Sequence, residues 1–365
     1  MKNVFGDALT VTLFGESHGQ AIGAVLDGLA PGIPVDEEII AHKLFLRRPY
    51  GALGTARREK DGFSILSGVY NGFTTGTPLT IVIPNGDTRS KDYEALHGIA
   101  RPGHCDYAAH EKYHGFEDDR GGGHFSGRLT AALVAAGAIA GSALSLRGVM
   151  IGTHILSLHG VVDRGFADYA EDIGMLDKLL FPVLDEEKAE KMKEEIAKAA
   201  EARDSVGGIL ETALTGLPAG LGEPFFDSVE SKLAHALFSI PGIKGVEFGC
   251  GFGFSSLYGS EANDAFEMKN GRVITATNRN GGINGGLTNG MPLIFRCAVK
   301  PTPSIGKEQK TVDFIKGENT VVAVAGRHDP AIVHRARAVV DALTALVLYD
   351  LYAGRYGTDF FGGKR

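Results

Sequence analysis

Apolar and polar residues alternate along several short stretches of the first hundred residues. The stretches at residues 9–14, 21–26, 64–70 and 79–84 are rich in β-branched residues, and each ends at or near Gly, Asn or Pro. Alternation with a period of two predicts strands, and Gly, Asn and Pro favour the turns that end them. The first half of the chain is therefore expected to be rich in β-sheet.

A longer spacing of apolar residues predicts helices elsewhere. Asp36, followed by two glutamates, is typical of a helix start, and the predicted helix runs to about residue 46 and carries Arg47 and Arg48 at its end. Residues 126–146 and 330–353 are apolar on nearly every side and rich in Ala, Val and Leu, which is typical of helices inside a protein. Residues 185–204 are strongly charged, so they predict a solvated surface helix.

A short pattern of turns occurs twice. DGLAPGIPVDEEI and TGLPAGLGEPFFDSVESKL each follow a predicted strand, at residues 21 and 208, and each reads as a Gly-Leu-Pro-like turn and a capped helix. Chance recurrence explains this about as well as duplication. Because both buried helices also follow basic, Gly-containing segments, DRGGGH and AGRHDP, we expect two halves related by a pseudo-two-fold axis. No linker or charge block divides the chain, so residues 1–365 are expected to form a single domain.

Composition adds constraints on partners and compartment. The chain has 365 residues with 51 Gly against 14 Pro, which predicts many unusual turns. A net charge of −7 argues against a general nucleic-acid or acidic-membrane binder. The three cysteines are far apart and lack CxxC spacing, so a reducing cytoplasm fits best. Asp7 interrupts any leader-like apolar run, and the uncharged run at residues 129–146 is short and diluted by small polar residues, so we expect neither export nor membrane insertion.

Two segments concentrate chemistry-bearing residues. FGESHG, residues 14–19, places Ser17 and His18 between glycines; it is either a turn with an incidental histidine or a site, and it does not fit a nucleophile elbow. Residues 100–130 hold four histidines, three arginines and a triple glycine. Three glycines at residues 121–123 just before a predicted helix let backbone N–H groups face an anion, although a generic Gly-rich turn is the alternative. A Walker-type loop is disfavoured because Lys-Ser/Thr does not follow.

Arginines and one aspartate extend this set. Guanidinium groups bind carboxylate and phosphate oxygens in bidentate geometry, although any single arginine can simply be a solvated surface residue. The candidates are Arg47, Arg48, Arg57, Arg58, Arg101, Arg120, Arg128 and Arg327. Asp329 and Pro330 resemble the cap and first residue of the last buried helix, and a carboxylate there could also accept a proton. A histidine metal site is disfavoured, because none of the histidines at 104, 110, 114 and 124 falls in HExxH or a comparable pattern.

Assembled in order, these motifs resemble the chorismate synthase family over nearly the whole chain. The matching motifs are FGESHG, RRPYG, ILSGVYNGFTTGTP, RPGHCDY, DRGGGHFSGR, GLPAGLGEP, GVEFG, NGGLTNG, KPTPS and AGRHDP. The resemblance implies an α+β fold, a β-α-β sandwich with a central layer of buried helices between antiparallel sheets. It further implies a homotetramer that converts 5-enolpyruvylshikimate 3-phosphate to chorismate and phosphate by anti-1,4 elimination, with reduced FMN as cofactor and no net redox change.

The resemblance also implies residue roles. His18 would donate a proton near the departing phosphate, His104 would protonate or neutralise reduced flavin, and Asp329 with Ser17 and Ser126 would form the relay for the ring proton. The expected substrate-binding residues are Arg47, Arg48, Arg101, Arg128 and Arg327. The expected FMN-contacting residues are His124, Phe125, Ser126, Gly285, Lys300, Pro301, Thr302, Pro303, Ser304 and Arg327. No metal, nucleic acid or membrane is expected as a partner.

The chain departs from the family pattern at two places. His124 and Phe125 follow the three glycines where many members have Arg and Ser, and Ala52 and Leu53 stand where many relatives carry a further arginine. NADPH could be the reductant of FMN, or an external reductase could supply the electrons, since no GxGxxG fingerprint is present. Two competing functions are an FMN-dependent reductase with the same phosphate-binding loop and an RNA-binding module, which the acidic net charge disfavours.

Overall fold

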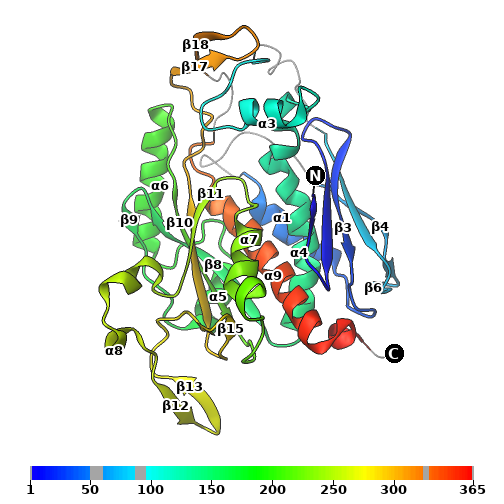
Figure 1. The fold of residues 1–365 in the computed structure, drawn as a ribbon, viewed down its shortest axis with the longest axis vertical. Helices are drawn as coiled ribbons and strands as arrows, with labels where there is room; N and C mark the ends of the chain where they lie inside the picture. Colours follow the sequence, from blue (N-terminus) through cyan, green and yellow to red (C-terminus); the bar gives the residue numbers. More distant parts are fainter. Residues whose placement is uncertain (1, 50–60, 87–95, 324–328, 364–365) are drawn as a thin grey trace.

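The computed structural model describes residues 2–49, 61–86, 96–323 and 329–363, and Figure 1 shows its arrangement. It is a mixed α+β fold in which every described strand pair is antiparallel, as expected from the sequence. The first five-stranded sheet has the order β1-β2-β3-β7-β4. Its strands are β1 (Val4–Phe5), β2 (Thr10–Gly15), β3 (Ala21–Asp27), β7 (Leu79–Pro84) and β4 (Ser64–Ser67). The alternating stretches near residues 9, 21, 64 and 79 are therefore confirmed as strands.

A second five-stranded sheet is built from the later part of the chain, in the order β11-β16-β10-β8-β9. Its strands are β11 (Ile243–Phe248), β16 (Leu293–Val299), β10 (Gly208–Thr215), β8 (Met150–Leu158) and β9 (Val161–Val162). Along β16 every second residue is buried, so one face of this sheet is part of the core. The smaller hairpins are β5 (Val69–Tyr70) with β6 (Phe73–Thr74), β12 (Phe266–Lys269) with β13 (Arg272–Thr275), β14 (Ile283–Asn284) with β15 (Leu287–Thr288), and β17 (Gln309–Asp313) with β18 (Glu318–Val322).

Two buried helices, α4 (Thr130–Ser145) and α9 (Val333–Tyr356), pack against each other in the centre. Helix α4 also contacts β3 and β7 of the first sheet, whereas α9 contacts β8 and β10 of the second (Figure 1). A Cβ added at Gly137 would lie 2.5 Å from Cα of Ala342, so glycine is needed for this close approach. The prediction of two internal helices is confirmed, but both begin later than expected. Helix α4 begins at 130 rather than 126, and α9 at 333 rather than 330.

The remaining helices surround this centre. They are α1 (Glu37–Arg47), α3 (Asp106–Tyr113), α5 (Tyr169–Leu176), α6 (Glu186–Glu201), α7 (Val229–Leu237) and α8 (Gly259–Ala262). Asp36 caps α1 by accepting from the N–H of Glu38 at 2.8 Å, as predicted. Helix α6 buries only its sparse apolar positions, which confirms the predicted surface helix. The apolar run at Gly127–Ser145 is long enough to cross a membrane, but 83% of its most apolar window is buried inside the protein.

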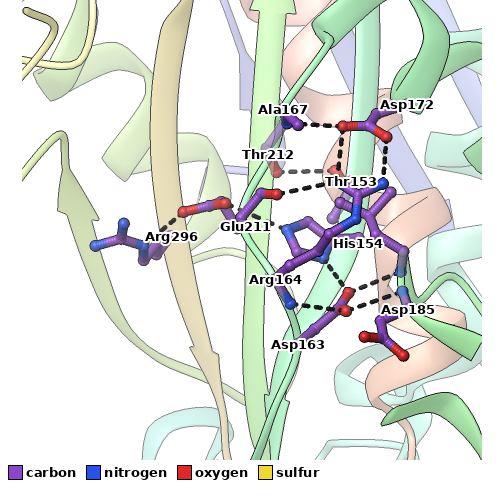
Figure 2. Close-up of polar contacts among 12 residues, drawn as sticks. Thr153, His154, Asp163, Arg164, Ala167, Asp172, Asp185, Glu211, Thr212 and Arg296 are labelled. Atoms are coloured by element: carbon purple, nitrogen blue, oxygen red, sulfur yellow. Dashed lines mark hydrogen bonds and ion pairs between the residues drawn. The ribbon is translucent and has the colours of Figure 1, made fainter. Parts of the chain in front are cut away.

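A polar network fixes the outer face of the second sheet (Figure 2). The imidazole of His154, on β8, lies between Asp163 Oδ2 at 2.9 Å and Glu211 Oε2 at 3.2 Å. Glu211 Oε1 in turn accepts from Nε of Arg296 at 2.8 Å. Asp163 also accepts from the N–H of Leu184 at 2.7 Å. The network therefore ties neighbouring strands to the segment that leads into α6.

Candidate active site

The turn between β2 and β3 carries Ser17 and His18 into the interior. Ser17 Oγ lies 3.2 Å from Nδ1 of His18 and 3.2 Å from each of the carbonyl oxygens of Arg120 and Gly121. The N–H of Ser17 donates to the carbonyl oxygen of Gly123 at 3.1 Å. Both side chains are buried, with 9% of Ser17 and 7% of His18 exposed. The FGESHG motif and the triple glycine thus form one local structure.

Glycine is required at residue 121 for this contact. Gly121 has a φ of 60°, and a Cβ there would lie 2.1 Å from Cε1 of His18. The expectation that the three glycines immediately precede a buried helix is wrong. They lie in the 3-10 turn Arg120–Phe125, and it is Ser126 that caps the next turn, Gly127–Leu129, by accepting from the N–H of Arg128 at 3.3 Å.

Three of the predicted substrate-binding arginines contact one carboxylate, Asp61, which the sequence did not single out. Arg47 Nη2 and Arg48 Nε each lie 3.4 Å from Oδ2 of Asp61, and Arg128 Nη1 donates to Oδ1. Burial raises the pKa of Asp61, but the guanidinium groups of Arg47, Arg128 and Arg48 outweigh this and hold the pKa below its usual value. The only sequence signal that could have pointed to Asp61 is its position three residues before the predicted strand at residue 64, and this signal is weak.

Arg128 connects this cluster to the His18 turn. Its Nε donates to Asn85 Oδ1 at 3.1 Å and its Nη2 to the carbonyl oxygen of Pro84 at 3.2 Å. Asn85 Nδ2 donates to the carbonyl oxygens of Glu16 at 2.9 Å and Gly19 at 3.0 Å, on either side of Ser17 and His18. Arg128 is therefore held by protein groups on all three of its nitrogens.

Arg101 is paired with Asp106 at the start of α3. Its Nε donates to Oδ2 at 2.8 Å and its Nη2 to Oδ1 at 2.7 Å, and its own N–H also donates to Oδ2 at 2.9 Å. The bidentate geometry fixes the plane of the guanidinium group. Arg101 is thus placed by its own chain at the edge of the segment that carries His104.

His104 meets the Lys300–Ser304 loop, about 200 residues later in the sequence. Its Nε2 lies 2.7 Å from Oγ of Ser304, and Lys300 Nζ donates to the carbonyl oxygen of Gly103 at 2.7 Å. Burial and the nearby charges of Arg101 and Lys300 lower the pKa of His104 to about 4, against the effect of Asp106. His104 is therefore neutral at neutral pH in this state. The two motifs that were predicted to share a ligand are in direct contact.

Asp329 does not cap α9, contrary to the prediction. The cap position is Ile332, and the carboxylate of Asp329 instead accepts from Nη1 of Arg335 at 2.5 Å. Its Oδ1 is buried and makes no hydrogen bond within the described residues. Burial raises the pKa of Asp329, only partly offset by Arg335 and the N–H of Ala331. The result is a buried, comparatively basic carboxylate.

A cavity of about 370 Å³ is lined by Arg101, whereas Ser17, His18, His104, Ser304 and Asp329 are not among its lining residues. Arg101 and Asp106 line it from the α3 side, and Gly122, His124 and Phe125 from the glycine-loop side. Its volume is in the range of small-molecule sites. His124 Nδ1 donates to the carbonyl oxygen of Gly15 at 2.7 Å, so this side chain is anchored to the end of β2.

Gly285 lies elsewhere in the same chain. It is in the β14–β15 hairpin. Ala219 pairs with Asn289 just after this hairpin, and its carbonyl oxygen accepts a hydrogen bond at 2.6 Å from Arg355, which is in the last turn of α9. Helix α9 has 24 residues and is about 36 Å long at 1.5 Å per residue; Asp329 precedes its first turn, whereas Arg355 is in its last. Arg57, Arg58 and Arg327, and the departures at Ala52 and Leu53, lie outside the described residues.

Comparison with known proteins covers almost the entire chain. A sequence model described as chorismate synthase matches residues 9–353. The chain belongs to the chorismate synthase family. The chorismate synthase of Methanosarcina barkeri is 46% identical over 349 residues, 95% of each chain. That of Thermococcus gammatolerans is 47% identical over 345 residues, 94% of this chain and 96% of its own. A crystal structure of chorismate synthase superposes with a TM-score of 0.77 at 29% identity, covering 98% of this chain and 95% of that one.

As a chorismate synthase, the protein is a lyase that converts 5-enolpyruvylshikimate 3-phosphate to chorismate. The family that the sequence motifs predicted is therefore confirmed. The structure brings together Ser17 and His18 with the glycine loop, Arg47, Arg48 and Arg128 around Asp61, and His104 with Ser304.

Proposed function

We propose that the protein catalyses an anti-1,4 elimination, in which the substrate loses a ring proton and its phosphate, with reduced FMN as cofactor and no net redox change. The substrate carries two carboxylates and a phosphate, which suits the guanidinium groups grouped around Asp61 and Asp106. The observation that carries the proposal is the contact between His104 and Ser304, because it joins the RPGH and KPTPS motifs at one place.

His18 is proposed as the proton donor at the departing phosphate. Its ring is buried against Gly121, and Ser17 Oγ lies beside its Nδ1, so the imidazole is held in one orientation. Asp329 is proposed as the final proton acceptor, with Ser17 and Ser126 in the relay. A carboxylate whose pKa is raised by burial is a better base than a solvated one.

The arginines divide into two kinds by exposure. Arg48 keeps 26% of its side chain exposed, so we propose that it contacts a substrate anion directly. Arg47 and Arg128 are more buried and bonded to protein groups, so they act on the anion mainly by fixing Asp61 and the neighbouring turn. Arg101 and Arg327 complete the proposed set.

Reduced FMN fits the described residues. Oδ1 of Asp329 and Oγ1 of Thr302 are buried without a hydrogen-bond partner within the described residues, and such atoms suit a bound polar group. When bound, the reduced flavin supplies an electron-rich ring system. We propose that it is held by His124, Phe125, Ser126, Lys300, Pro301, Thr302, Pro303 and Arg327. NADPH is proposed as its reductant, with an external reductase as the alternative.

We further infer a cytoplasmic homotetramer of single-domain subunits, each a β-α-β sandwich with pseudo-two-fold halves. The repeated strand, turn and capped helix at β3–α1 and β10–α7 supports the two halves. Gly285 lies near the hairpin that contacts the last turn of α9, and Asp329 precedes its first turn, so we propose that the FMN contact expected of Gly285 is made to the flavin of another copy of the chain. Light scattering should give the mass of a tetramer, and a monomer at micromolar concentration would contradict this.

The test of the reaction is an anaerobic stopped-flow experiment with reduced FMN and 5-enolpyruvylshikimate 3-phosphate, with and without NADPH. Phosphate release without net oxidation of reduced FMN supports the elimination. Substrate-independent oxidation of NADPH without phosphate release would instead identify an FMN-dependent reductase. Turnover with oxidised FMN and NADPH alone would show that the protein reduces its own flavin.

A further inference from the structure

We propose that Ser304 positions His104 by donating its hydroxyl proton to Nε2 of the imidazole, so that His104 presents a protonated Nδ1 to the ligand. Ser304 is thereby a positioning residue that acts through His104, in place of the direct FMN contact expected for it. The inference rests on the proposed role of His104 in proton transfer.

The contact between the two side chains is built into the docking of two loops. Lys300 Nζ donates to the carbonyl oxygen of Gly103 at 2.7 Å, and a Cβ at Gly103 would lie 2.8 Å from Cβ of Pro303. On its other side, the loop is held by Ser205, whose Oγ donates to the carbonyl oxygen of Thr302 at 2.7 Å. The 2.7 Å separation of Ser304 Oγ and His104 Nε2 is thus supported by contacts of Lys300, Thr302 and Pro303, which directly precede Ser304.

The two ring nitrogens of His104 have different surroundings. Nε2 is in contact with Ser304, whereas Nδ1 makes no hydrogen bond within the described residues. A neutral imidazole carries one N–H, and a hydroxyl that donates to one nitrogen leaves the proton on the other. Because the Ser304 hydroxyl has no other hydrogen-bond partner in the described part of the chain, donation to Nε2 satisfies its proton as well.

The charges around the imidazole favour this neutral form. Arg101 and Lys300 oppose protonation and Asp106 favours it, while burial also opposes it, so the pKa of His104 is lowered to about 4. Near neutral pH His104 therefore has a single N–H, and Ser304 decides which nitrogen carries it. A neutral imidazole with its proton on Nδ1 can donate a hydrogen bond to a ligand at that nitrogen and holds the negative charge of a reduced flavin there without giving up the proton.

The first test needs neither cofactor nor substrate. It is imidazole nitrogen NMR of the full-length protein labelled with 15N-histidine, in which the His104 signals are assigned by their loss in His104→Gln. The spectrum should show a protonated Nδ1 and an unprotonated Nε2 at pH 7. In Ser304→Ala the preference for Nδ1–H should be lost and the pKa of His104 should rise, because a donor to the neutral form has been removed. A protonated Nε2 in the unchanged protein, or an unaltered spectrum in Ser304→Ala, would overturn the proposal.

The matched control is Ser205→Ala, which removes an anchor of the same loop but leaves the hydroxyl at 304. It should keep the His104 spectrum and the pH profile of turnover, whereas Ser304→Ala should lower kcat about tenfold with KM nearly unchanged and shift that profile. Equal losses in both variants would mean that only loop anchoring matters and would refute the positioning role. Normal turnover in His104→Ala would instead refute the proposed function of His104, while the NMR result would still stand by itself.

Discussion

Asp61 and Arg128 form an ion pair inside the protein, with 0% and 4% of their side chains exposed. The pair lies between the first sheet and the start of α4, and Arg47 and Arg48 share the same carboxylate. A buried charge requires a partner, because an ion left alone in the interior loses its hydration without compensation. The proposed anion-binding region, formed by these arginines, therefore includes an acidic residue of its own.

Asp61→Asn should weaken both the fold and substrate binding. Removing one partner of a buried ion pair leaves the guanidinium groups uncompensated, so the free energy of unfolding should fall by about 3–5 kcal/mol. The KM for 5-enolpyruvylshikimate 3-phosphate should rise, because Arg48 loses its anchor. Urea denaturation and steady-state kinetics measure the two effects. Glu190→Gln, which removes an exposed pair with Lys193, should change stability by less than about 1 kcal/mol. Equal stability of the two variants would contradict the role of Asp61.

His18→Ala should lower turnover by about 10²–10⁴, the usual contribution of a positioned acid or base. The ring stands between Ser17 and Gly121, and its removal leaves space at this turn. Single-turnover phosphate release should show the loss while circular dichroism stays unchanged. His159→Ala, at an exposed histidine of the β8–β9 turn, is the control and should retain full turnover. A His18→Ala enzyme as active as this control would remove His18 from the reaction.

Asp329→Asn should abolish turnover at an almost unchanged melting temperature. The side chain does not cap α9; Asn loses the ion pair with Arg335, whose side chain keeps 20% exposure and can be solvated, and the amide avoids the cost of a buried charge. The loss in kcat should be at least about 10², because the amide cannot accept a proton. Asp185→Asn, at the cap of α6, is the same chemical change at a purely structural carboxylate and should leave kcat unchanged. Near-normal kcat in Asp329→Asn would defeat the assignment.

Stability should fall with rising pH through the titration of His154. Burial lowers the pKa of His154, but hydrogen bonds to Asp163 and Glu211 outweigh this, so its pKa in the folded protein is raised. Its stabilising contribution is full below the unfolded-state pKa of about 6.5 and is lost as the pH rises through the folded-state pKa. Melting temperatures measured across this range should fall less steeply in His154→Gln than in the unchanged protein. Parallel curves would show that His154 is not protonated in the fold.

The sequence correctly predicted the features of the fold that depend on residues close together in the chain. The cap at Asp36, the alternation in β2 and β3 and the apolar surfaces of α4 and α9 depend on neighbours in the chain, and all are present in the structure. The direct contact of His104 with Ser304 was not predicted; the family resemblance implied only that both lie at the flavin, because no local rule brings residues so far apart together.

Other parts of the site depend on tertiary contacts that no spacing reveals. Asp61 gains its importance from Arg128, which is 67 residues later in the chain. The late start of α9 reflects the pairing of Asp329 with Arg335, which competes with a capping role. The distance of Gly285 from Asp329 follows from the length of α9 and its packing.

The last long helix is also the centre of the protein, and this constrains synthesis on the ribosome. Asp350 accepts hydrogen bonds from the N–H groups of Asp7, Ala8 and Leu9, at 3.1, 2.7 and 2.9 Å, and Tyr349 accepts one from the N–H of Ala30 at 2.8 Å. The first sheet, whose last strand in the sequence ends at Pro84, therefore emerges from the exit tunnel well before α9, which begins at Val333 and covers its end. Until α9 is released, the nascent chain exposes the apolar surfaces of α4 and β8, so the central packing forms only after α9 has left the ribosome, and exposed apolar surface favours aggregation in the interval.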